Sequence, residues 1–86
     1  MPPLDSEHAR WFIEEVQPHE PRLRAYLRRN FPQLHDVDDV VQESYLKICR
    51  ARIEGRLNSA RGFLFTTARN LALDVFRRSR ASPFDD

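Results

Sequence analysis

The stretch GFLFTTARNLALDVFRRSR, residues 62–80, decides the fold. Apolar side chains recur through it at helical spacing: Leu64, Ala68, Leu71 and Val75, with Phe65, Ala72 and Phe76 beside them. A wide apolar face with this period predicts a core helix, which we expect to start at about Ala60. Because the stretch ends in Arg77, Arg78 and Arg80, the far end of that helix is either solvated or a surface for nucleic acid.

A second helix is predicted to start after Asp36 and to end between Arg52 and Glu54. Asp36 followed by Asp39 is typical of an N-cap with an acid in the first turn. The apolar stripe of this helix comprises Val37, Val40, Val41, Tyr45, Ile48 and Cys49. Between the two helices, EGRLNSARG (residues 54–62) contains both glycines of the chain and predicts a loop, with Asn58 or Ser59 as the cap of the last helix.

The N-terminal part predicts a helix that opens at Asp5 or Ser6 and is interrupted by Pro18 and Pro21. A further helical segment, or a continuation after a kink, is expected over residues 21–30. The apolar positions of this part are Trp11, Phe12, Val16, Leu23, Tyr26, Leu27 and Phe31. Since no strand-like alternation occurs, we expect a single all-α domain: a bundle of three or four helices over residues 5–80, with a tail at 81–86.

Composition excludes several classes of protein. The chain has 86 residues, 41% of them hydrophobic and 31% charged, which fits one small folded domain rather than general disorder. Cys49 is the only cysteine, so no internal disulfide forms. No apolar run approaches the roughly 20 residues of a membrane span, and the N-terminus resembles no signal peptide. These features predict a cytoplasmic location and no membrane insertion.

The residues that commonly carry catalysis or bind metals are scattered. His8, His19 and His35 have no helical spacing to one another, and Cys49 has no partner for a metal site. The Asp36–Asp39 segment lacks the glycine and closing glutamate of a calcium loop. We therefore expect no enzyme activity, no metal and no cofactor.

Charge is segregated along the chain although its net value is only +1. Residues 36–43 contain acids and no base, whereas residues 50–80 contain arginines opposed only by Glu54 and Asp74. The exposed face of the acidic helix is either solvated or a docking face for another protein. In the last helix Phe63 and Asn70 suit stacking and hydrogen bonding to bases, but Phe63 equally suits a core, with the arginines balancing the helix dipole.

Two segments, DVDDVVQESYLKICRA (36–51) and RGFLFTTARNLALDVFRR (61–78), together resemble region 2 of bacterial RNA polymerase sigma factors. The resemblance is to the extracytoplasmic function group and, within it, to the type associated with iron-uptake regulation. It extends from about Glu7 to Arg80. The chain departs from the family pattern at Phe63, where many relatives have tryptophan, and it lacks the helix-turn-helix domain that reads the minus-thirty-five element.

The resemblance implies an all-α promoter-recognition domain with two binding surfaces. One docks on the coiled coil of the polymerase β′ clamp through Asp39, Gln42, Glu43, Tyr45 and Cys49. The other, formed by the 54–62 loop and the last helix, captures the non-template strand of the minus-ten element. Asn70 falls where the family holds a flipped base, and Thr66 and Arg69 fall where it faces the upstream edge of that element.

The DNA-binding residues expected from the resemblance and from the residue chemistry are Asn58, Ser59, Arg61, Phe63, Thr66, Arg69, Asn70, Arg77 and Arg78. The expected partners are the core RNA polymerase, promoter DNA and an anti-sigma factor. The alternative is a helical protein-interaction module that does not bind nucleic acid.

Overall fold

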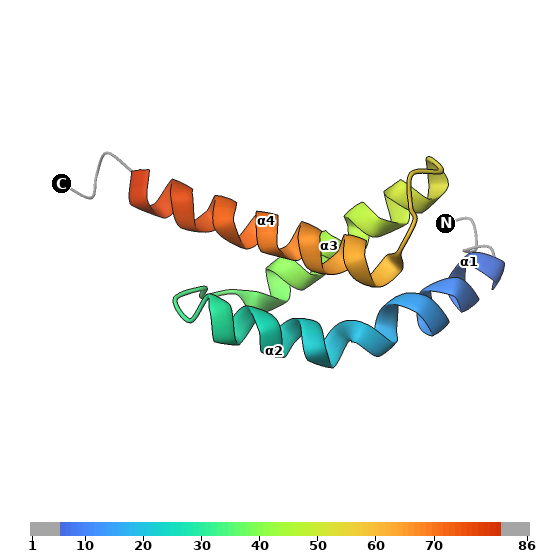
Figure 1. The fold of residues 1–86 in the computed structure, drawn as a ribbon, viewed down its shortest axis with the longest axis horizontal. Helices are drawn as coiled ribbons and strands as arrows, with labels where there is room; N and C mark the ends of the chain where they lie inside the picture. The colour runs from blue at the N-terminus through green and yellow to red at the C-terminus, as the bar shows by residue number, and fades with distance from the viewer. Residues whose placement is uncertain (1–5, 82–86) are drawn as a thin grey trace.

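The computed structural model describes the backbone of residues 6–81 and the side chains as far as Arg78 (Figure 1). Its elements in chain order are α1 (Ser6–Trp11), a π-helical turn η1 (Phe12–Val16), a 3-10 turn η2 (Gln17–His19), α2 (Glu20–Asn30), α3 (Val37–Ile53) and α4 (Ala60–Ala81). The all-α fold is confirmed. Asp5, the side chain of Arg80 and the predicted tail beyond Ala81 lie outside the described residues.

The segment from α1 to α2 is one bent helical rod in which the turns η1 and η2 interrupt the regular α-helix, so the predicted continuation after a kink is confirmed (Figure 1). A proline ring clashes with the carbonyl group four residues earlier in a regular α-helix. Here the helix widens to a π turn before Pro18, as the hydrogen bond from Gln17 N–H to the Phe12 carbonyl shows. Pro21 lies in the first turn of α2, where its missing N–H costs nothing.

Both ends of α3 are fixed by local hydrogen bonds. The Asp36 carboxylate accepts from the Asp39 amide at 3.0 Å, which confirms the predicted N-cap. At the other end Gly55 takes a positive φ of 74°, so that the amides of Gly55 and Arg56 bond to the carbonyls of Arg52 and Ala51. This arrangement is a Schellman cap, and it turns the chain sharply into the following loop.

As predicted, α4 begins at Ala60, so the loop between α3 and α4 covers residues 54–59 rather than all of 54–62. Ser59 is the N-cap of α4: its hydroxyl accepts from the Gly62 amide at 3.0 Å. Residues 60–62 therefore form the first turn of α4.

The core lies where α3 crosses α4 and both cover the rod (Figure 1). Its fully or nearly fully buried apolar side chains are Val16, Leu23, Leu27, Val40, Val41, Ile48, Ala51, Leu64, Ala68 and Ala72. Ser44 is also fully buried, and its hydroxyl donates to the Val40 carbonyl at 2.7 Å.

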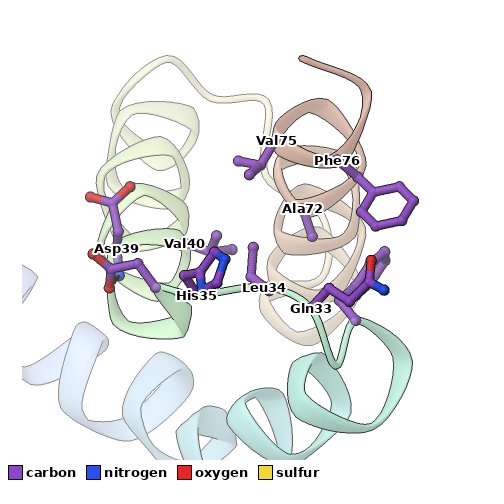
Figure 2. Close-up of a pocket in the computed structure, with 10 residues that line it drawn as sticks. Gln33, Leu34, His35, Asp39, Val40, Ala72, Val75 and Phe76 are labelled. Atoms are coloured by element: carbon purple, nitrogen blue, oxygen red, sulfur yellow. Dashed lines mark hydrogen bonds between the residues drawn. The ribbon is translucent and has the colours of Figure 1, made fainter. Parts of the chain in front are cut away.

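The far end of α4 contradicts the predicted core. Val75 and Phe76 are each 37% exposed and line an open depression of about 460 Å³ with Leu34, Val40 and Ala72 (Figure 2). The last turns of α4 extend past the loop between α2 and α3, so no helix covers them fully (Figure 1). Helical spacing was right about the side of α4 on which these residues lie, but not about how far the core extends.

Candidate functional site

A depression of about 510 Å³ lies beside the loop that precedes α4 and the first turns of α4. It is lined by Arg56, Asn58, Ser59, Gly62, Phe63, Thr66, Thr67 and Asn70. The Schellman cap of α3 and the Ser59 cap of α4 fix the two ends of the loop, and the helical residues share one face of α4 at steps of three and four. Five of the nine residues expected to bind DNA thus lie together.

The chemistry of this depression suits a planar polar ligand. The Phe63 ring is half-buried, so its position is fixed while part of its surface stays accessible. Asn70 and Thr66 are exposed, and their amide and hydroxyl groups can both donate and accept hydrogen bonds. The volume falls within the range typical of small-molecule sites, about 300–1,000 Å³, and is large enough for a nucleotide base.

The four arginines expected to bind DNA lie outside this depression. Arg61 and Arg69 are exposed on α4 but do not line it. Arg77 pairs with Asp74 at 3.5 Å, with both side chains mostly exposed. Arg78 lies on the side of α4 that faces α3, where it lines a shallow depression with Asp39 and Glu43.

Three residues that line the depression were not predicted: Arg56, Gly62 and Thr67. Thr67 could have been found from its spacing, since it lies four residues after Phe63 and three before Asn70. Arg56 could not, because its position depends on the turn at Gly55.

The exposed face of α3 is a second candidate surface. Asp39, Gln42 and Glu43 are exposed, as predicted for a solvated or docking face. Two large apolar residues on the same face were not predicted: Leu46 is 66% exposed and Ile53 is 77% exposed. Both fall outside the predicted apolar stripe of α3. Their apolar side chains at positions off that stripe were the sequence signal that could have identified them.

Tyr45 and Cys49 are half-buried at the edge of this face. The Tyr45 ring packs edge-on against the Phe12 ring, with 5.0 Å between the ring centres, and the Tyr45 hydroxyl donates to the Glu20 carboxylate. Arg24 links Glu20, at 2.9 Å, to Asp38, at 2.7 Å. This polar network, Tyr45–Glu20–Arg24–Asp38, ties α3 to α2. Separately, burial raises the pKa of the Cys49 thiol, which disfavours its thiolate.

The hydrogen bonds from Tyr45 and Arg24 hold the pKa of Glu20 below its ordinary value of 4.5. A carboxylate with a lowered pKa stabilises the fold above its unfolded pKa, and that stability is lost as the pH falls through the folded pKa. We expect Glu20→Gln to lose less thermal stability than the wild type between about pH 6 and pH 3. Tyr45→Phe, which removes the larger of the two hydrogen-bond effects, should fall between them.

Thermal melts followed by circular dichroism at several pH values measure this difference. Parallel melting curves for the wild type and Glu20→Gln would show that the network does not contribute to acid stability.

The N-terminal helix is held to the end of α3 by one cation–π contact. The Arg52 guanidinium lies 4.7 Å from the centre of the Trp11 ring and 2.9 Å from His8 Nδ1. Within residues 6–81 no cluster of three or more His, Cys, Asp or Glu side chains is placed to hold a metal ion. None of the helices described there is long and apolar enough to cross a membrane.

Comparisons with known proteins identify the family to which the chain is similar. The family model described as Sigma-70 region 2 matches residues 16–82. The ferric citrate uptake sigma factor FecI of Escherichia coli (strain K12) is 30% identical over 61 residues, which are 71% of this chain and 35% of FecI. The chain thus spans about a third of the length of that relative. No solved structure matches the chain.

The family model covers most of the chain, including both motifs from which the resemblance was drawn. The chain therefore belongs to the Sigma-70 region 2 family, of the extracytoplasmic function type, and is similar to an iron-uptake sigma factor.

Proposed function

We propose that the depression beside α4 binds an unpaired base of the non-template strand of the minus-ten element during transcription initiation. The observation that supports this most is the meeting of Phe63, Thr66 and Asn70 with Asn58 and Ser59 in one depression. An aromatic ring, an amide and hydroxyl groups are the side chains that stack on a base and hydrogen-bond its edge. In this proposal Asn70 is the principal base contact.

Capturing an unpaired base has an energetic cost that this site can offset. Unstacking and unpairing a base costs a few kcal/mol, while stacking on an aromatic side chain returns about 1–3 kcal/mol per base. Hydrogen bonds to Asn70 supply the remainder and the sequence preference. Outside the depression, Arg61, Arg69, Arg77 and Arg78 attract phosphates without regard to sequence.

We further propose that the exposed face of α3 docks on the coiled coil of the polymerase β′ clamp. Leu46 and Ile53 lie seven residues apart, two turns along one helix face, which is the spacing of a helix-on-helix contact. Gln42 and Glu43 surround this apolar pair with polar groups that can set the register. Tyr45 and Cys49 then contribute from the edge of the contact rather than from its centre.

The DNA-binding proposal predicts that Asn70→Ala removes sequence preference. A preferred strand is first selected from a randomised single-stranded pool with the wild-type chain, and a permutation of it serves as the scrambled strand. By fluorescence anisotropy, Asn70→Ala should reduce the difference between the two strands by about 1–3 kcal/mol, the value of a good base contact. Arg77→Ala is the matched control, and it should weaken the binding of both strands by the same factor.

Equal affinity of the wild type for both strands would reject base recognition. No binding of either strand would favour a protein-interaction module that does not contact nucleic acid.

A further inference from the structure

Two further depressions, lined by residues of both α3 and α4, lie next to the proposed base-binding depression. Thr67 and Asn70 also line a neighbouring depression of about 270 Å³, together with Lys47, Leu71 and Asp74. The last three residues in turn line a depression of about 350 Å³ that reaches Asp39, Glu43 and Arg78. Because each depression shares residues with the next, the three lie in a row along α4 from the loop before it to the level of Arg78, and we call this row the groove.

The charge of the α3 side of this groove reverses along its length. Asp39, Glu43 and Lys47 follow one another at steps of four residues, so they lie on one side of α3. The two acids lie toward the far end of the groove, and Lys47 lies next to Asn70. On the α3 side, a phosphate is therefore attracted at the Asn70 end and repelled beyond it, whereas Arg78 lines the far end from α4.

Lys47 is the only lysine of the chain. Its side chain is exposed, and none of the ion pairs among the described side chains includes it. Asp74, which lines both of the further depressions with Lys47, pairs instead with Arg77 at 3.5 Å. Among the described residues, the ammonium group thus faces the groove without a carboxylate partner.

We propose that Lys47 binds a backbone phosphate of the strand whose base occupies the Asn70 depression, and that Asp39 and Glu43 keep the strand away from α3 beyond this point, on the side of Arg78. The inference rests on the proposed function and adds to it a contact from α3, the helix whose exposed face docks on the polymerase. A lysine is suited to this role because its compact, mobile charge neutralises a phosphate without demanding a fixed geometry.

Because Lys47 is the only lysine, an amine-acetylating reagent reports on it directly. The chain is treated with an N-hydroxysuccinimide acetate in the presence or absence of the selected strand, with free Nα-acetyl-lysine in the same tube as the rate reference. Peptide mass spectrometry then gives the acetylation rate of Lys47. We expect the bound strand to slow it by at least about threefold, since a phosphate hydrogen-bonded to the amine shields it from the reagent.

Replacement of Lys47 provides an independent measurement. Lys47→Gln should weaken binding of the selected and scrambled strands by the same factor, about fivefold at 0.1 M salt. It should also reduce the slope of log affinity against log salt concentration by about 0.7, as expected for one lost phosphate contact on single-stranded DNA. Lys47→Arg should restore most of the affinity and most of its salt dependence. Arg29→Gln, on the exposed side of α2, removes the same charge away from the groove and should change affinity by much less.

The possible results separate this inference from the proposed function. If the strand binds with an Asn70-dependent preference but neither protects Lys47 nor responds to Lys47→Gln more than to Arg29→Gln, the Lys47 contact is wrong and base recognition stands. If no strand binds the wild type, both fall together.

Discussion

Replacing Leu64 with alanine is expected to lower the free energy of unfolding by about 2–5 kcal/mol, the cost of a leucine-to-alanine cavity in a closely packed core. Leu64 is fully buried in α4, where it belongs to the core shared with α3 and the rod. A small domain has about 5–15 kcal/mol of stability in total, so this one change removes a large part of it. Urea denaturation followed by circular dichroism measures the loss.

Leu46→Ala is the matched control, because it makes the same chemical change in a helix at a side chain that is 66% exposed. It should alter the free energy of unfolding by no more than about 0.5 kcal/mol. Similar losses for Leu46→Ala and Leu64→Ala would contradict the assignment of one leucine to the core and the other to the surface.

Leu46→Asp is expected to weaken binding to the isolated β′ clamp coiled coil by about 2 kcal/mol, or near thirtyfold, while leaving affinity for single-stranded DNA unchanged. The change places a charge at the centre of the proposed contact, where the apolar pair Leu46 and Ile53 lies. Affinity for the clamp is measured by isothermal titration calorimetry, and affinity for the strand by anisotropy. Ile13→Asp, at an apolar side chain that is 57% exposed on η1, is the control for an added surface charge.

A parallel loss of clamp and DNA binding in Leu46→Asp would indicate a folding defect rather than a docking residue. Unchanged clamp binding would place the docking face elsewhere on the domain.

Much of the fold could be predicted because its signals are local. The Asp36 and Ser59 caps, the limits of α3 and the start of α4 depend on residues within one or two turns, and the structure confirms them. The kink between α1 and α2 was predicted from the prolines, but the π turn before Pro18 was not, since such a turn has no clear sequence pattern.

The errors and omissions at the surfaces have a different cause. Periodicity shows which side of a helix is apolar, but not whether another helix covers it at a given level. Val75 and Phe76 were therefore placed in the core, and Leu46 and Ile53 were overlooked. The neighbourhood of Lys47 depends on how α3 crosses α4, a long-range feature that a single sequence does not contain.

The candidate DNA site was partly predictable, because part of it depends only on spacing along one helix. Phe63, Thr66 and Asn70 share one helix face, so spacing alone brings them together. The residues that the loop contributes depend on the caps at its two ends and on the turn at Gly55. The residues that form the caps can be recognised in the sequence, but the direction of the turn cannot.

The central claim, that an unpaired strand binds beside the start of α4, is tested most directly by an NMR titration of the ¹⁵N-labelled chain with the selected single strand. We expect the largest shift changes for the amides of Asn58 to Asn70 and for the side-chain amide of Asn70, and smaller changes with the scrambled strand. Shifts centred instead on Leu34, Val75 and Phe76 (Figure 2), or the same shifts with either strand, would contradict it.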